Sequence, residues 1–168
     1  MSSVTPEQLL SNAFATAKRI GGMLDKVKDE KTLFAELDES YEASQMGASV
    51  SRLLVQRVTP QPIQDALVSK GYYDEVLKLS EETAQGYYTY IKCLRRGDSA
   101  EVCRKKYKQV IFFVDSTGKE RLLLEMRMPN LTADEKNAVL NVQNESMVRM
   151  ALEIDERITN QSRGSVYG

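Results

Sequence analysis

Three segments of the sequence carry the signature of a helix N-terminus. In this signature a Thr, Ser or Asp side chain is followed three residues later by Glu or Gln, so that the first N–H groups of the helix are satisfied reciprocally. It occurs at Thr5–Gln8, with Pro6 at the first helical position, at Asp98–Glu101 and at Thr132–Glu135. Repeated helix starts of this kind predict a chain that is mainly α-helical.

Apolar residues at steps of three and four, together with Pro and Gly stops, set the expected helix bounds. We expect helices over residues 6–24, about 30–58, 62–70, 73–95 and 133–159. The predicted fold class is therefore mainly α, a helical bundle of five or six helices. The Thr-Pro-Gln-Pro run at residues 59–62 ends one helix and is a candidate hinge.

The segment from about residue 30 to residue 58 follows a heptad with small residues at its centre. Its repeating positions are Phe34, Leu37, Tyr41, Ser44, Ala48, Ser51, Val55 and Val58. Small side chains allow another backbone to approach closely. The segment is thus either a core helix of the bundle, which we expect, or a seam for self-association.

Residues 110–128 admit two interpretations. The run Val110–Val114, a turn at Asp115–Lys119 and a second run from Arg121 to Met128 are typical of a small β-hairpin. The same segment also fits a helix, because Tyr107, Val110 and Val114 lie at helical spacing. We expect the hairpin.

Length and composition favour one compact helical domain over residues 1–159, followed by a flexible C-terminal tail at residues 160–168. The chain has 168 residues, 42% of them hydrophobic and 28% charged. No run of about 18 apolar residues occurs, and the first ten residues lack a secretory pattern. We therefore expect a cytoplasmic protein that does not enter a membrane.

The absence of histidine excludes most common catalytic centres. Ser-His-Asp and Cys-His nucleophiles and the usual zinc and haem ligand sets all require an imidazole. Paired acids such as Asp38-Glu39 are adjacent in sequence, so they point in different directions on a helix. We expect a protein that is not an enzyme and has no catalytic residues and no cofactor.

The two cysteines, Cys93 and Cys103, are too few for a disulfide framework or a four-ligand zinc site, so we expect no metal. If Gly97 marks a turn between two helices, the two thiols can meet across a helical hairpin and form a disulfide. Buried free thiols are the usual state in the cytosol and are the expectation here.

Charge is distributed unevenly although the formal net charge is -1. Residues 92–108 contain seven basic and two acidic side chains, whereas residues 25–42 contain seven acidic side chains and three lysines. This polarity suits self-association, an acidic partner or a polyanion.

The sequence also offers a candidate nucleic-acid interface on the basic helical hairpin at residues 87–108. Six basic side chains would neutralise phosphates: Lys92, Arg95, Arg96, Arg104, Lys105 and Lys108. Two tyrosines, Tyr88 and Tyr107, would stack on bases. The alternative is a solvated basic face, with Glu101 pairing with Lys105 and the tyrosines half-buried in the core.

These observations predict a non-enzymatic structural or adaptor subunit. It would act through helix-mediated protein–protein contacts, in an oligomer or a larger assembly. The alternative function is a small nucleic-acid-binding protein, such as a coat or ribonucleoprotein subunit, that uses the hairpin at residues 87–108.

Overall fold

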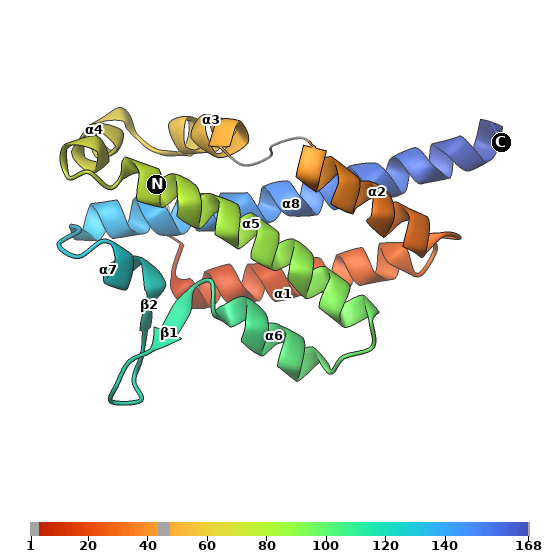
Figure 1. Ribbon diagram of the computed structural model, residues 1–168, viewed down its shortest axis with the longest axis horizontal. Helices are drawn as coiled ribbons and strands as arrows, with labels where there is room; N and C mark the ends of the chain where they lie inside the picture. Colours follow the sequence, from red (N-terminus) through yellow and green to blue (C-terminus); the bar gives the residue numbers. More distant parts are fainter. Residues whose placement is uncertain (1–3, 44–47, 168) are drawn as a thin grey trace.

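The computed structural model describes residues 4–43 and 48–167, and within them it contains eight helices and one two-stranded antiparallel sheet (Figure 1). The prediction of a mainly α fold with one small hairpin is confirmed. In chain order the elements are α1 (Pro6–Leu24), α2 (Glu30–Ala43), α3 (Ala48–Val58), α4 (Gln61–Ser69), α5 (Tyr73–Arg95), α6 (Ala100–Lys108), β1 (Phe112–Val114), β2 (Glu120–Leu122), α7 (Leu123–Arg127) and α8 (Ala133–Tyr167).

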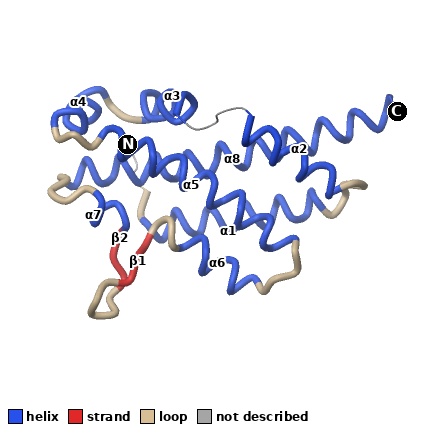
Figure 2. The backbone as a smooth tube through the Cα atoms, viewed as in Figure 1, coloured by secondary structure: helices blue, strands red, loops and turns tan. Residues whose placement is uncertain are grey.

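The long helices α5 and α8 form the centre of the molecule and pack along each other (Figure 1). Helices α3 and α4 lie along one side of this pair, and α1 lies on the opposite side. Helix α6 packs against the C-terminal half of α5, and α2 packs against α8. The two strands project from the helical body beside α6 and α7 (Figure 2).

The core forms because the apolar faces of these helices meet. One cluster of buried side chains joins α1, α2, α5, α6 and α8. A second joins α1, α3, α4, α5, α7 and α8, and the hairpin residues Phe112, Phe113 and Leu122 pack against it. Leu10 and Val110 pack against both clusters. Each fully buried Leu or Ile contributes about 1.5–3 kcal/mol relative to an exposed one. Helix α8 contributes apolar side chains to both clusters, and its buried residues include Leu140, Met147, Ala151, Ile154 and Ile158.

Two of the three predicted helix caps are confirmed. The Thr5 hydroxyl accepts from the Gln8 amide while the Gln8 side chain accepts from the Thr5 amide. Thr132 and Glu135 exchange the equivalent pair of bonds. The third prediction is wrong by one residue, because Ser99 rather than Asp98 caps α6 by accepting from the Val102 amide. Asp98 is thereby left without a capping role.

The segment predicted as one helix over about 30–58 is described as α2 and α3, and its middle, residues 44–47, lies outside the described residues. Where the heptad positions are described, they support a core role. Leu37, Ser51 and Val55 are buried.

The candidate hinge at residues 59–62 lies between α3 and α4. The Gln64 side chain donates to the carbonyls of Gln56 and Thr59, at 3.2 and 2.8 Å. These bonds fasten α4 to the end of α3. A hinge motion here stays a prediction.

The segment 110–128 is part hairpin and part helix. Phe112, Phe113 and Val114 pair with Leu122, Arg121 and Glu120. The second strand is shorter than predicted, because Leu123–Arg127 forms α7. The turn between the strands uses Gly118 at a φ of 81°, and the Asp115 carboxylate accepts from the Thr117 and Lys119 amides. Leu, Glu and Met favour the helix once the turn has brought Leu123 back to the core.

Helix α8 continues to Tyr167, so the expected helix end near Thr159 is wrong. The residues after 159 lack an apolar stripe, which is why the pattern gave no sign of the continuation. Gly168, the last residue of the expected tail, lies outside the described residues.

Candidate binding groove

The predicted basic helical hairpin exists and consists of the second half of α5, a turn and α6. The turn is possible because Gly97 takes a φ of 90°, a conformation that disfavours residues with a Cβ. Cys93 and Cys103 form a disulfide across it, with Cα atoms 5.8 Å apart. The expectation of free thiols is therefore not met in this structure, and the two arms of the hairpin are covalently joined.

The two predicted interface cations on α5, Lys92 and Arg95, pair with carboxylates of the same chain. Lys92 Nζ lies 3.0 Å from Asp38, and Arg95 lies 2.8 Å from Asp25 and 2.7 Å from Glu30. These acids belong to the acidic region at residues 25–42. Two of the seven basic residues at 92–108 thus pair with three of the seven acids at 25–42 within one chain.

The tyrosines predicted as stacking platforms are buried. Tyr88 is 6% exposed, and its hydroxyl donates to Asp38 at 2.5 Å and lies 3.2 Å from the Phe34 carbonyl. Burial raises the pKa of Asp38, but the hydrogen bonds from Tyr88 and Lys92 outweigh it, so the net shift of this pKa is downward. Tyr107 is 1% exposed and packs against the rings of Tyr87 and Tyr90. Neither ring offers a face to a base in this conformation.

The exposed cations of the hairpin lie on α6 and on the turn. Arg96, Arg104, Lys105 and Lys106 are exposed. In the described part of the chain, no carboxylate lies within 4.0 Å of Arg104, Lys105 or Lys106, so the expected Glu101–Lys105 pair does not form. Of the eight predicted interface residues, the structure leaves Arg96, Arg104, Lys105 and, in part, Lys108 accessible.

Arg104, Lys105 and Lys108 line a groove of about 800 Å³ between α6, the β-hairpin and α1. Its other lining residues are Phe14, Glu101, Gln109, Phe112, Phe113, Val114 and Glu120. Val114 is 66% exposed and leaves apolar surface at the groove open to solvent. The groove therefore combines aromatic rings with a row of cations.

Two cations lie directly over the groove rings. The Arg104 guanidinium carbon is 4.8 Å from the Phe14 ring centre, and Lys108 Nζ is 5.7 Å from that of Phe112. Lys108 also lies 3.4 Å from Glu120. The cation–π contacts orient both charges along the groove rather than straight out into water.

A second hollow of about 620 Å³ extends the groove along α1. It shares Phe14 and Arg104 with the first, and its other lining residues include Leu10, Leu94 and Lys18. The two hollows meet at the Arg104–Phe14 contact.

Sequence reasoning missed the three phenylalanines as site residues. Phe14 fitted the apolar stripe of α1, and Phe112 and Phe113 fitted a strand, so each had an ordinary structural explanation. The sequence gave no signal that separates this role from a core role, because Phe112 and Phe113 both pack partly against the core and both line the groove.

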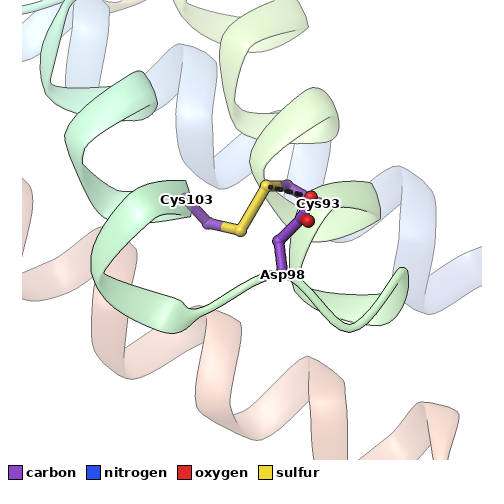
Figure 3. A group of neighbouring side chains, drawn as sticks. All are labelled: Cys93, Asp98 and Cys103. Carbon is purple, nitrogen blue, oxygen red and sulfur yellow. Dashed lines mark hydrogen bonds between the residues drawn. A yellow bond between two sulfur atoms is a disulfide. The ribbon is translucent and has the colours of Figure 1, made fainter.

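One further cluster gathers residue types that bind metal ions, although its two sulfur atoms are joined in the disulfide. Over residues 4–43 and 48–167, the group in which three Cys, Asp or Glu ligand atoms lie within 4.8 Å of one another is Cys93, Asp98 and Cys103 (Figure 3). It lies at the tip of the α5–α6 hairpin.

Comparison of this chain with family models, with curated proteins and with solved structures found no match. In the described part of the chain, none of the helices combines the length and the apolar character needed to cross a membrane.

Proposed function

We propose that this protein is a non-enzymatic adaptor subunit that binds a segment of a protein partner in the groove between α6, the β-hairpin and α1. The observation that carries this proposal is the placement of Arg104, Lys105 and Lys108 around the exposed edges of Phe14, Phe112 and Phe113. The proposal keeps the cytoplasmic location expected from the sequence.

The chemistry of the groove defines the segment that fits it. Aromatic and aliphatic anchors that enter partly apolar pockets supply most of the binding free energy at interfaces. Arg104 and Lys105 have no carboxylate partner in the described chain, so a bound carboxylate would not need to displace one. A segment with an aromatic or aliphatic side chain flanked by Asp or Glu fits this groove, because the apolar side chain contacts the phenylalanine rings and the carboxylates pair with Arg104 and Lys105.

A partner is favoured over self-association by the internal charge pairing. Head-to-tail contacts between copies would use the acidic region at residues 25–42 and the basic region at residues 92–108. Asp25, Glu30 and Asp38 already pair with Lys92 and Arg95 within one chain. Breaking these pairs to form the same pairs between molecules gains little.

Single-stranded nucleic acid is the second candidate ligand. The observation that favours it is the contact of Arg104 with Phe14 and of Lys108 with Phe112, since cations beside rings are typical of surfaces that bind phosphate and stack bases. The aromatic residues of such a surface are these phenylalanines and not Tyr88 or Tyr107.

A peptide-display selection with the full-length protein as bait tests the first candidate. We expect enrichment of peptides in which an aromatic or aliphatic residue is flanked by acids. Fluorescence anisotropy then measures the Kd of one enriched peptide and, in parallel, of a labelled single-stranded oligonucleotide.

A matched pair of valines controls this measurement. Val114 lines the groove, whereas Val102 is 47% exposed on α6 and does not line it. We expect Val114→Asp to raise the peptide Kd by about tenfold, because like charges now face each other, and Val102→Asp to leave it nearly unchanged. Tight oligonucleotide binding with no enriched peptide contradicts the adaptor proposal and supports the second candidate.

A further inference from the structure

The tip of the α5–α6 hairpin brings two sulfur atoms and one carboxylate together. Cys93 is the third residue from the C-terminus of α5, Cys103 is the fourth residue of α6, and Asp98 lies in the turn between them (Figure 3). Cys93 and Cys103 are buried, at 1% and 0% exposed, while Asp98 is exposed. The spacing is symmetric, since four residues separate Asp98 from each cysteine.

The Asp98 carboxylate faces the sulfur atoms although no capping role holds it there. Oδ2 of Asp98 lies 3.4 Å from Sγ of Cys93, the approach drawn as a dashed line in Figure 3. A thiol at Cys93 donates a hydrogen bond across this distance, but a disulfide sulfur has no proton to donate. The arrangement of Asp98 is therefore better suited to the reduced pair than to the disulfide.

We infer that, when the disulfide is reduced, Cys93, Asp98 and Cys103 bind a thiophilic divalent cation of the Zn²⁺ class. Thiolate and carboxylate are both ordinary zinc ligands, and three protein ligands leave the fourth tetrahedral position for water. The cation then replaces the disulfide as the cross-link between α5 and α6. The sequence alone suggested no metal because only the thiols were counted, and Asp98 supplies the third ligand.

The geometry needs only a local rearrangement. Zinc–sulfur bonds of about 2.3 Å at a tetrahedral angle place two sulfur atoms about 3.8 Å apart. All three ligand atoms of the cluster already lie within 4.8 Å of one another. Opening the sulfur–sulfur bond and rotating the two cysteine side chains therefore reaches the required separation without moving the helices apart.

The chemistry balances with a dithiol reductant. The disulfide accepts two electrons and two protons, and the reductant is oxidised from a dithiol to a disulfide. The cation then displaces the two thiol protons, which go to the buffer, while Asp98 binds as the carboxylate. Cys93 lines a hollow of about 250 Å³ beside Thr89 and Lys106, which gives small molecules a route to the buried sulfur.

Either cross-link holds α6 in place, so the inference stands independently of what binds in the groove. Cytosolic thiol systems keep cysteines reduced. In that compartment the metal form, and not the disulfide, would fasten the hairpin.

Titration with Co²⁺ tests the site. The full-length protein is reduced with dithiothreitol, desalted under anaerobic conditions and titrated while absorbance and far-ultraviolet circular dichroism are recorded. We expect one Co²⁺ per chain, with a thiolate-to-cobalt charge-transfer band and visible bands typical of tetrahedral cobalt, on a chain that keeps its helical signal. Zn²⁺ should displace the cobalt.

Three variants and the oxidised protein decide the outcome. The oxidised chain and Cys93→Ser should lack the charge-transfer band, and Asp98→Asn should raise the Kd by at least about tenfold. Asp134→Asn, which makes the same change at an exposed carboxylate of α8 outside both the cluster and the groove, should have no effect. The inference is overturned if the reduced chain shows no charge-transfer band, if Cys93→Ser keeps it, or if Asp98→Asn and Asp134→Asn behave alike.

Discussion

Tyr87 and Tyr107 allow the packing of the core to be tested with one pair of variants. Their ring centres lie 5.4 Å apart, and the side chains are 0% and 1% exposed. The Tyr87 hydroxyl donates to the Ala13 carbonyl at 2.7 Å. The Tyr107 hydroxyl is buried and has no hydrogen-bond partner among residues 4–43 and 48–167. The two positions thus share an environment and differ in one interaction.

Replacement of each tyrosine by phenylalanine should change stability in opposite directions. Tyr87→Phe removes a buried hydrogen bond, which lowers the free energy of unfolding by about 1 kcal/mol. Tyr107→Phe removes a hydroxyl whose burial is uncompensated, which raises that free energy by up to about 1 kcal/mol. The two variants should therefore differ by roughly 2 kcal/mol.

Urea unfolding followed by circular dichroism measures this difference, provided that the slope of unfolding free energy against urea is the same for both variants. A Tyr107→Phe variant that loses as much stability as Tyr87→Phe would show that the Tyr107 hydroxyl has a partner and would refute the reasoning.

Three further changes should have measurable effects. The double variant Cys93→Ser, Cys103→Ser should have an unfolding free energy about 2–3 kcal/mol lower than that of the oxidised protein, because the disulfide closes a loop with a sequence separation of 10 and so restricts the unfolded chain. Unchanged urea unfolding would contradict the presence of this cross-link. Hydrogen bonds from the Thr117 hydroxyl and the Lys119 amide lower the pKa of Asp115 from 3.8 to about 2. The ionised Asp115 therefore stabilises the fold above pH 4, and this stabilisation is lost as the pH falls toward 2. Asp115→Asn should remove this part of the pH dependence of unfolding, and an unaltered pH dependence would contradict the prediction. Gly118→Ala should lower the melting temperature by an amount equivalent to about 1–2 kcal/mol, because Gly118 has a positive φ, and an unchanged melting temperature would show that this turn does not need glycine.

Local signals in the sequence were sufficient for much of the fold. The Thr5 and Thr132 caps involve contacts only three residues apart, and the α5 bounds at Tyr73 and Arg95 follow from its apolar stripe and Gly97. The hairpin was expected from its turn, but the length of β2 was not. The strand ends before Leu123 because packing against the core favours a helix there. This contact involves distant segments, so the residue spacing within 110–128 does not reveal it.

The site depended on contacts between distant segments, so its residues were only partly predicted. Phe14 and Phe112 lie in one groove although 98 positions separate them in the sequence. Lys92 was expected to bind phosphate, but in the fold it pairs with Asp38, which lies 54 positions earlier in the sequence. Arg104 and Lys105 are exposed because α6 buries only one face, and their role in binding stays a prediction.

Two adjacent lysines provide the most direct test of groove binding. Lys105 lines the groove and Lys106 does not, while both are exposed and have no carboxylate within 4.0 Å in the described chain. Fluorescence anisotropy with an enriched acidic peptide should give a Kd about tenfold higher for Lys105→Glu and nearly unchanged for Lys106→Glu. Equal weakening by both variants, or no weakening by Lys105→Glu, would contradict binding in the groove.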